Sequence, residues 1–429
     1  MENKACIKVL SVCTSLGGGA GRAAYRIHQG VRNLGVDSQM LLKAGQSNDP
    51  NIITLDEFVP KNSFYKAFDW SWNKVKNQIQ HFHWNRYPER ENVFMSDLRG
   101  VNLHGALRKL DYGILHLHWI NNRYVSLKDL PKEKPIVWTL HDSWPFCGIC
   151  HYFFECKEYQ WECGCCPFLH SDDSKDLSYK VWKKKARIYQ DLDLHIVTPS
   201  RWLADCAQQS SLLRRYPVTV IPNCLDVNVY RPLTEKEISP RWLELMRIKS
   251  TKKLVLFGAV NATKDKVKGF SHLMSALSTL DAQGRTSDIE LVVFGANKSE
   301  LKIDLNIPIH YIGYVGNTQE MVSLYNLADV TAVPSLSENL SCTIMESLSC
   351  GTPVVAFNIG GNGEMIEQQE NGYLAMECDD DSLAEGILWC LENNKENCLG
   401  KKGRKKVLIE YTNEIVCCKY KELFESLMS

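Results

Sequence analysis

Short apolar runs alternate with amphipathic stretches along the N-terminal half of the chain. An apolar run at 7–12 leads into a glycine-rich loop at 17–21, and an apolar periodicity of helical type then ends at Gly35. Another apolar run at 38–42 completes a strand–helix–strand order, which is typical of a parallel sheet. Further buried-strand patterns, each followed by polar residues, lie at 113–116, 136–140 and 195–198. The N-terminal half is therefore predicted to be an α/β domain.

The same alternation starts again after a proline-flanked stretch at 217–222. Strand patterns with helical patterns between them lie at 253–258, 290–295, 309–312, 330–333 and 353–357. A chain of 429 residues exceeds what one hydrophobic core usually organises. We therefore predict two Rossmann-like domains, at 1–217 and 218–410, and an amphipathic helix at 411–429 that crosses back to the first domain.

The region 60–100 is polar and aromatic and has no clear period, so it is interpreted as an insertion. Trp70, Trp72, Lys74 and Lys76 could contact lipid there. An ordinary insertion without lipid contact is the simpler interpretation.

Charge and hydropathy exclude several classes of protein. Fifty basic residues balance fifty acidic ones, so no global field would attract nucleic acid, and an anionic ligand must be held locally. No apolar run approaches the roughly 18 residues that a membrane span needs. The apolar stretch at 7–12 is too short for the core of a signal peptide. The chain is expected to be cytoplasmic.

The strongest local signal surrounds two glutamates eight positions apart, Glu338 and Glu346. A strand pattern ends at Pro334, and helix-forming residues run from about Ser341 to Ser349, with Gly351 placed to end the helix. Glu338 then lies on the loop before the helix and faces a sugar, while Glu346 lies two turns inside it and could accept hydrogen bonds from a ribose. Backbone N–H groups at the start of this helix could hold a diphosphate; they belong to Leu340, Ser341, Cys342 and Thr343. Solvated surface glutamates are the alternative.

This segment resembles the Glu-x7-Glu signature of glycosyltransferase family 4. That is a retaining family with the GT-B fold, in which two Rossmann-like domains face each other across a cleft. The resemblance extends in the right order over about fifty residues, at 325–330, Pro334-Ser335, 351–356, 360–364 and 371–374. It implies that Glu338 contacts the sugar of a UDP- or GDP-sugar donor and Glu346 its ribose. It also places Gly361 and Asn362 beside the sugar and phosphates, and it requires no metal or other cofactor.

A cluster of lysines follows the strand pattern at 253–258. Lysine can neutralise a diphosphate leaving group, and Lys268-Gly269 matches the lysine that family members use. The arginine that accompanies it in the family has no match at 259–263. Either Lys264 or Lys266 replaces that arginine, or the donor phosphates are held more weakly. A solvated lysine-rich loop is the alternative.

The glycine-rich loop satisfies the dinucleotide fingerprint GxGxxA at 19–24. A NAD site would also need an acid at the end of the second strand, and none follows residue 42. Gly18 and Gly19 resemble the first loop of family 4 enzymes instead, and they are interpreted as a place where the backbone approaches donor or acceptor closely. A purely structural tight turn is the alternative.

Histidines follow two of the predicted strands. His141 comes after the strand at 136–140 and could donate a hydrogen bond to a substrate hydroxyl or phosphate. Family 4 members often have a histidine at this place beside the donor sugar, which implies a catalytic role. His116 and His118 have a similar setting and are interpreted as cleft lining, on the acceptor side.

Six cysteines lie between 147 and 166. Cys150, Cys156, Cys163 and Cys166 could form a tetrahedral thiolate set for a structural zinc ion. Reduced packing cysteines and disulfides are the alternatives. Similar segments recur in a bacterial polysaccharide-synthesis branch of family 4, and no catalytic role is assigned to the cluster.

These observations predict a retaining, hexosyltransferase-type enzyme that moves a sugar from a nucleoside diphosphate sugar to an acceptor hydroxyl. The capsule and exopolysaccharide relatives imply a polyprenyl-diphosphate-linked oligosaccharide as acceptor and a peripheral position at the inner membrane face. Two alternatives stay open. One is a catalytically weak nucleotide-sugar-binding protein, and the other is a Rossmann-type epimerase or oxidoreductase that acts on nucleotide sugars.

Overall fold

The computed structural model of the chain describes residues 7–45, 47–58, 84–91, 94–96, 98–101, 103–298 and 305–428. Trp70, Trp72, Lys74 and Lys76, in the region interpreted as an ordinary insertion with lipid contact as the alternative, lie outside the described residues. The chain divides into two compact units. Unit 1 comprises Met1–Pro199, Leu203–Ile221 and Cys418–Ser429, and unit 2 comprises Ser200–Trp202 and Pro222–Cys417.

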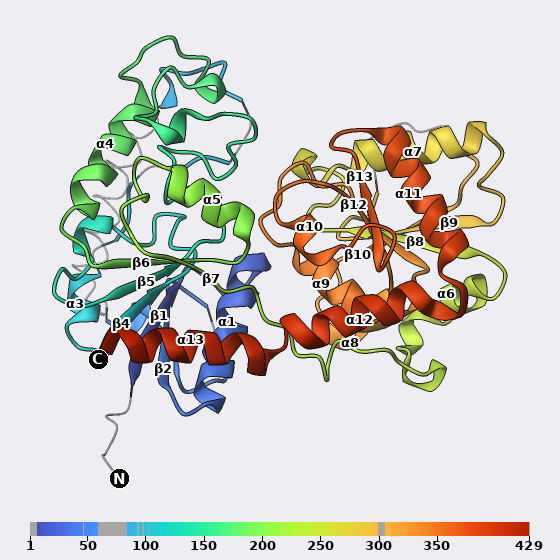
Figure 1. Cartoon of the computed structure of the whole chain (residues 1–429), viewed down its shortest axis with the longest axis horizontal. Coiled ribbons are helices and arrows are strands. Elements are labelled where there is room, and N and C mark those ends of the chain that lie inside the picture. The colour runs from blue at the N-terminus through green and yellow to red at the C-terminus, as the bar shows by residue number, and fades with distance from the viewer. Residues whose placement is uncertain are drawn as a thin grey trace. The chain divides into compact units, whose positions relative to one another are not determined.

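Unit 1 is built on a parallel sheet with the strand order β3-β2-β1-β4-β5-β6-β7 (Figure 1). The strands are β1 Lys8–Cys13, β2 Asp37–Leu42, β3 Ile52–Thr54, β4 Ile114–Leu117, β5 Ile136–Thr139, β6 Leu194–Thr198 and β7 Val218–Val220. β4 and β5 are buried at every residue, as expected for central strands of a parallel sheet that is covered on both faces. The short strands β3 and β7 were not predicted, and β7 lies in the proline-flanked stretch at 217–222, after which the second alternation starts.

The helices of unit 1 are α1 Gly18–Asn33, α3 His104–Leu107, α4 Leu177–Tyr189, most of α5 Arg201–Gln209 and the end of α13 Asn413–Met428. From Cys418 onward α13 belongs to unit 1, where Tyr420 and Phe424 are fully buried. Lys421 donates a 2.9 Å hydrogen bond to the Leu34 carbonyl at the end of α1, and Figure 1 shows α13 (red) beside α1 (blue). The predicted return of the C-terminal helix to the first domain is confirmed.

Unit 2 contains a second parallel sheet, with the strand order β10-β9-β8-β11-β12-β13. Its strands are β8 Lys253–Gly258, β9 Ile289–Phe294, β10 Ile309–Gly313, β11 Val330–Val333, β12 Val354–Phe357 and β13 Gly372–Ala375. Across both sheets, every strand predicted from sequence is present within one residue at each end. Two Rossmann-like parallel-sheet domains, as the GT-B fold requires, are therefore confirmed.

Helices cover both faces of the second sheet. Alternate residues of β8 point to opposite sides, so that Leu254 and Leu256 enter one core while Val255 and Phe257 enter the other. One face is covered by α7 Phe270–Ala282 and α11 Asp380–Asn393, and the other by α8 Thr318–Leu327, α9 Cys342–Ser349 and α12 Cys398–Glu410. The shorter helices are α6 Leu243–Lys249 and α10 Asn362–Met365.

Helix α9 ends where the sequence predicts. Gly351 adopts a left-handed backbone with φ +80°. Its N–H bonds to the Leu348 carbonyl at 3.0 Å, and the N–H of Thr352 bonds to the Ser347 carbonyl at 3.0 Å. This pair of bonds satisfies the last carbonyls of the helix, and glycine adopts the required φ without steric cost.

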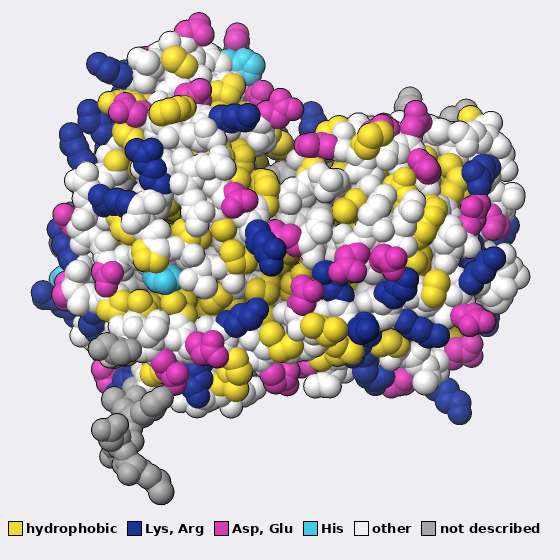
Figure 2. Space-filling model, viewed as in Figure 1, with side chains coloured by type: hydrophobic (Ala, Val, Ile, Leu, Met, Phe, Trp, Pro, Cys, Tyr) yellow, Lys and Arg dark blue, Asp and Glu magenta, His cyan; other side chains and the backbone are white. Residues whose placement is uncertain are grey.

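Basic and acidic side chains are interspersed on the face of the molecule shown in Figure 2, consistent with a net charge of zero. Among the helices that the structure describes, none is long and apolar enough to cross a bilayer.

One glycine in unit 2 is fixed both by its backbone angle and by a close contact. Gly269 precedes α7 with φ +71°, and a Cβ added there would lie 1.8 Å from the Pro334 carbonyl oxygen. Gly284 has nearly the same angle, φ +69°, but no atom within 4 Å of an added Cβ. The two positions therefore separate backbone strain from steric contact.

We expect Gly284→Ala to lower the free energy of unfolding by about 1 kcal/mol through left-handed strain alone. Gly269→Ala should cost at least about 2–3 kcal/mol, because the Pro334 segment must also move. Urea unfolding of both variants, followed by far-UV circular dichroism, measures the difference. Equal costs at the two positions would show that the close contact is easily relieved.

Candidate active site

The side chains of Lys268 and Glu338 meet in unit 2. Lys268 belongs to a 3-10 turn, Lys266–Lys268, and this turn packs against the segment after β11, where the Leu336 N–H donates to the Val267 carbonyl at 2.8 Å. The Lys268 ammonium donates to Glu338 Oε1 at 2.7 Å, and the two side chains are only 25% and 15% exposed. Two residues predicted from separate segments are thus brought into one partly buried ion pair.

Two glycines after β12 hold the backbone of Glu338 in place. Gly360 has φ +53°, and a Cβ there would lie 1.7 Å from the Glu338 carbonyl oxygen. A Cβ on Gly361 would lie 2.1 Å from the Asn339 carbonyl oxygen. Only glycine allows this approach, so the loop after β12 lies directly against the segment that carries Glu338.

Asn362, predicted with Gly361 to line the donor site, is fully buried. Its Nδ2 donates to the Phe357 carbonyl at 3.1 Å, while its Oδ1 has no hydrogen-bond partner in the described part of the chain. The structure therefore shows Gly361 and Asn362 folding the loop against Glu338, and their contact with a donor stays a prediction.

The start of α9 differs slightly from the prediction. Ser341 is the residue before the first helical position, and the first helical hydrogen bond runs from the Met345 N–H to the Ser341 carbonyl at 3.2 Å. The amides of the first turn are therefore those of Cys342, Thr343 and Ile344, and Leu340 lies outside them. The positive end of the helix dipole still follows Glu338 by four residues.

Glu346 lies inside α9 and is 2% exposed. The hydroxyl of Tyr325, on the neighbouring helix α8, donates to Glu346 Oε2 at 3.1 Å. A buried carboxylate is costly unless it accepts hydrogen bonds. The alternative of two solvated glutamates is therefore wrong, because Glu346 is buried and Glu338 is ion-paired.

The neighbouring lysines differ from Lys268. Lys266, predicted to bind the donor, shares its 3-10 turn but is exposed, and Lys264 is exposed as well. The solvated-loop alternative thus fits Lys266 in this structure and does not fit Lys268. Replacement of the missing arginine by either exposed lysine stays a prediction.

In unit 1 the predicted glycine loop is mostly helix. α1 begins at Gly18, with only Gly17 as its cap, so residues 18–21 form its first turn. A Cβ on Gly18 or Gly19 would meet nothing within 4 Å, whereas one on Gly21 would lie 2.3 Å from the Ser15 carbonyl oxygen. Close packing explains Gly21, while Gly18 and Gly19 leave an exposed helix start where a ligand's approach is sterically open.

His141 follows β5, as predicted. Its Nε2 lies 3.1 Å from His118 Nδ1, and burial lowers the pKa of His141 to about 4. The imidazole is therefore neutral at pH 7, and one ring nitrogen carries a proton that can be donated.

The interpretation of His116 and His118 as cleft lining is wrong. They are 1% and 2% exposed. His116 Nε2 bonds to Thr139 Oγ1 at 2.8 Å, and Thr139 Oγ1 in turn lies 3.0 Å from the hydroxyl of Tyr420. The rings of Tyr420 and Phe424 on α13 pack against His116. The local sequence around 116–118 contains no signal that predicts this packing.

Asp142 and His151 form a polar pair that the sequence interpretation missed. Asp142 Oδ2 lies 2.5 Å from His151 Nδ1 and accepts from the Trp119 indole N–H at 2.8 Å. Burial alone would raise the pKa of Asp142, but His151 and these hydrogen bonds hold it below its usual value. The adjacent pair His141-Asp142 after a strand was the available signal, since both residues leave the carboxyl end of β5.

Comparison with known proteins decides the family. The model of the family described as "Glycosyltransferase Family 4" matches residues 17–229 of the chain. The model of the family described as "Glycosyl transferases group 1" matches residues 245–406. The chain belongs to these glycosyltransferases. It is therefore a transferase of EC class 2.4 that takes its sugar from a nucleotide sugar, which removes the epimerase and oxidoreductase alternative.

The transferase also resembles individual proteins. An uncharacterized glycosyltransferase of Methanocaldococcus jannaschii is 25% identical over 70% of this chain and 76% of its own length. The putative colanic acid biosynthesis glycosyl transferase WcaC of Escherichia coli is 24% identical over 60% of this chain and 62% of its own length. The transferase thus spans less than two thirds of WcaC.

Solved structures confirm the fold of the transferase. A glycosyltransferase from Rickettsia africae superposes with a TM-score of 0.66 and 15% identity over 99% of both chains. HepE of Anabaena, solved with UDP and glucose, superposes with a TM-score of 0.62 and 16% identity over 98% of this chain and 100% of that one.

Buried histidines predict how unit 1 of the transferase responds to acid. Burial lowers the pKa of His28 and His141 to about 4 and that of His116 to about 3, below the unfolded value of 6.5. As the pH falls below 6.5, the unfolded chain binds more protons than the folded one, so this part of the stability is lost on acidification.

We expect the free energy of unfolding of unit 1 to fall by about 1–2 kcal/mol per buried histidine between pH 7 and pH 5. Urea titrations at the two pH values measure it. His28→Gln removes one of the groups and should flatten the dependence. A stability that does not change over this range would contradict the neutral, buried state of these rings.

Proposed function

We propose that this transferase moves the sugar of a nucleoside diphosphate sugar to an acceptor hydroxyl with retention of the anomeric configuration. The observation that carries the proposal is the Lys268–Glu338 ion pair, which lies four residues before the first turn of α9. Cation, carboxylate and helix dipole are thus gathered where a charged diphosphate and a neutral sugar would adjoin.

Each group has a separate role. The ammonium of Lys268 and the first-turn amides of α9 hold the diphosphate, whose charge grows as the sugar leaves. Glu338, released from Lys268 when the phosphates bind, accepts hydrogen bonds from the sugar hydroxyls. Glu346 accepts from the ribose, and the neutral His141 donates to a sugar hydroxyl.

The reaction is a front-face displacement. The acceptor oxygen bonds to the anomeric carbon on the face from which the diphosphate departs, and the bond between that carbon and the phosphate oxygen breaks. The acceptor proton passes to an oxygen of the leaving diphosphate, which balances the charge. Glu338 is not needed as a nucleophile, because the acceptor oxygen attacks the anomeric carbon directly, from the face that the diphosphate leaves.

We propose a UDP-sugar as donor and a lipid-linked oligosaccharide as acceptor in cell-surface polysaccharide synthesis. The relative from E. coli bears the name of a colanic acid biosynthesis enzyme, and the structural neighbour HepE was solved with UDP-glucose. An acceptor on a lipid carrier would bring the transferase to the inner face of the membrane as a peripheral protein. These names support the proposal as similarities only.

Glu338→Gln tests the assignment of the carboxylate. We expect transfer to fall by about 10²–10³-fold, because the charge that positions the sugar is lost, while donor affinity changes only a few-fold. Steady-state transfer assays and isothermal calorimetry measure the two quantities. Glu370→Gln is the matched control, since Glu370 pairs with Lys402 on the exposed surface. Unchanged transfer by Glu338→Gln would refute the assignment.

Lys268→Met tests the phosphate-binding role. We expect free UDP and the donor to bind about tenfold or more weakly, because the diphosphate loses its nearest cation. Calorimetry with UDP-, GDP- and other activated sugars also identifies the nucleotide. A wild-type protein that binds donor but never transfers sugar would favour the binding-protein alternative.

A further inference from the structure

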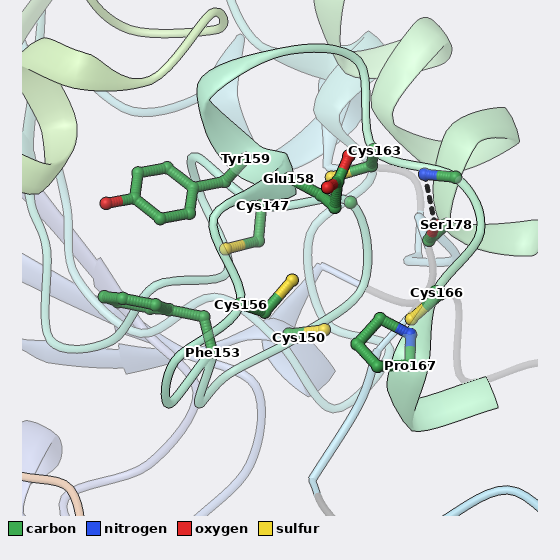
Figure 3. Close-up of a pocket in the computed structure, with 12 residues that line it drawn as sticks. Cys147, Cys150, Phe153, Cys156, Glu158, Tyr159, Cys163, Cys166, Pro167 and Ser178 are labelled. Atoms are coloured by element: carbon green, nitrogen blue, oxygen red, sulfur yellow. Dashed lines mark hydrogen bonds between the residues drawn. The ribbon is translucent and has the colours of Figure 1, made fainter. Parts of the chain in front are cut away.

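A small cavity in unit 1 is lined by five cysteines from one segment of the chain. They are Cys147, Cys150, Cys156, Cys163 and Cys166, and with Phe153, Tyr159 and neighbouring backbone they enclose a space of about 20 Å³ (Figure 3). Such a space has room for a single small guest. The proposed transfer reaction uses none of these side chains.

We propose that Cys150, Cys156, Cys163 and Cys166 bind a structural Zn²⁺ as thiolates. Zn²⁺ takes four thiolate ligands in tetrahedral geometry at about 2.3 Å, and such closed sites stabilise small irregular segments. The region 143–176 is of that kind, since it contains only two short 3-10 helices, Glu158–Gln160 and Pro167–Leu169. The ion would close the chain between Cys150 and Cys166.

Backbone amides already face three of these four sulfur atoms. The N–H of Glu158 bonds to the sulfur of Cys156, and that of Gly148 to the sulfur of Cys163. The sulfur of Cys166 accepts from the amides of Phe168 and Leu169 and from the thiol of Cys150. Hydrogen bonds of this kind orient the sulfur ligands around a metal ion.

The surrounding charge also suits a thiolate cluster. Four thiolates and one Zn²⁺ carry a net charge of −2, which needs compensation in a buried site. The fully buried ammonium of Lys185 donates to the carbonyl oxygens of Cys147 at 2.9 Å and Gly148 at 3.0 Å, and it acts electrostatically on Cys163. Asp176 acts in the opposite sense on Cys166, to whose N–H it is bonded.

The remaining cysteines of the segment are excluded from the ligand set. The sulfur of Cys147 bonds to the side chain of Ser143, and Figure 3 shows it on the side of Phe153 and Tyr159. Cys165 is exposed and directs its sulfur toward the Asp172 carbonyl at 3.5 Å. These two positions therefore serve as matched controls.

Ion binding requires the four side chains to close on one point. Over the ranges that the structure describes, no three ligand-type side chains are gathered as a ready metal site, and the described cysteines are free thiols. Rotation about χ1 moves a sulfur atom by a few ångströms, which is the scale of the cavity. The ion would then fix Cys150 and, through the next residue, His151 against Asp142.

Metal content of the full-length protein, purified without chelator or added zinc, tests the proposal. We expect about one zinc per chain by mass spectrometry of the elements, released when a mercurial reagent titrates four thiols. Co²⁺ exchanged into the site should give a thiolate-to-metal charge-transfer band. Cys150→Ser and Cys166→Ser should lower the zinc content below about 0.2 per chain, whereas Cys147→Ser and Cys165→Ser should keep it.

Three outcomes would overturn the proposal. The first is a wild-type protein that contains no metal and whose clustered thiols all react at once with the mercurial reagent. The second is a disulfide between any two of the four cysteines. The third is a zinc ion that Cys166→Ser retains and Cys165→Ser loses. If Cys166→Ser does not fold, the wild-type zinc content and the four-thiol release decide alone. None of these measurements depends on sugar transfer, so failure here leaves the proposed reaction untouched.

Discussion

The candidate donor site depends on close backbone contacts between the loops that follow neighbouring strands of the second sheet. The carbonyl oxygens of Pro334, Glu338 and Asn339 lie where the side chains of Gly269, Gly360 and Gly361 would otherwise be. Each contact joins the loop after one strand to the loop after another, and β8, β11 and β12 are neighbours in the sheet. Because the carboxyl ends of parallel strands share one edge, these contacts bring Lys268 to Glu338.

Among the residues of unit 1 that the structure describes, polar side chains also gather at the carboxyl ends of neighbouring strands, but they form no lysine–glutamate pair of the kind found in unit 2. His118 and Trp119 leave the end of β4, and His141 and Asp142 leave the end of β5. They are bonded mainly to one another, so the edge holds neutral imidazoles beside an anchored carboxylate. Such an arrangement favours hydrogen-bond donation to an uncharged ligand over attraction of a phosphate.

Much of the fold could be predicted because buried parallel strands are nearly continuous apolar runs. β3 and β7 lack that pattern, since they are three residues long and only partly buried. β13 was quoted only as part of a motif, because Gly372-Tyr373 resembles a turn as much as a strand. The end of α9 at Gly351 was predicted correctly, since a helix end favours a residue with a left-handed backbone. The start of α1 at Gly18 was not predicted, because a run of glycines resembles a loop.

The candidate site was predictable where one short segment carries the chemistry, as for Glu338 and Glu346. The ion pair with Lys268 joins residues 70 positions apart and becomes visible only when the loops are placed. The pairing of Asp142 with His151 needed an unpatterned loop to fold back. The burial of His116 depends on rings that arrive from α13, about 300 residues later in the sequence.

That late arrival has a consequence for biosynthesis. Tyr420 and Phe424 complete the core of unit 1, yet the ribosome adds them only after all of residues 222–417. Unit 2 is formed almost entirely by one continuous stretch of the chain, so all of its residues are available before α13 is complete. At that stage the apolar face of unit 1 that α13 covers is still exposed. Nascent unit 1 therefore exposes a surface of the kind that chaperones bind until translation supplies its last helix.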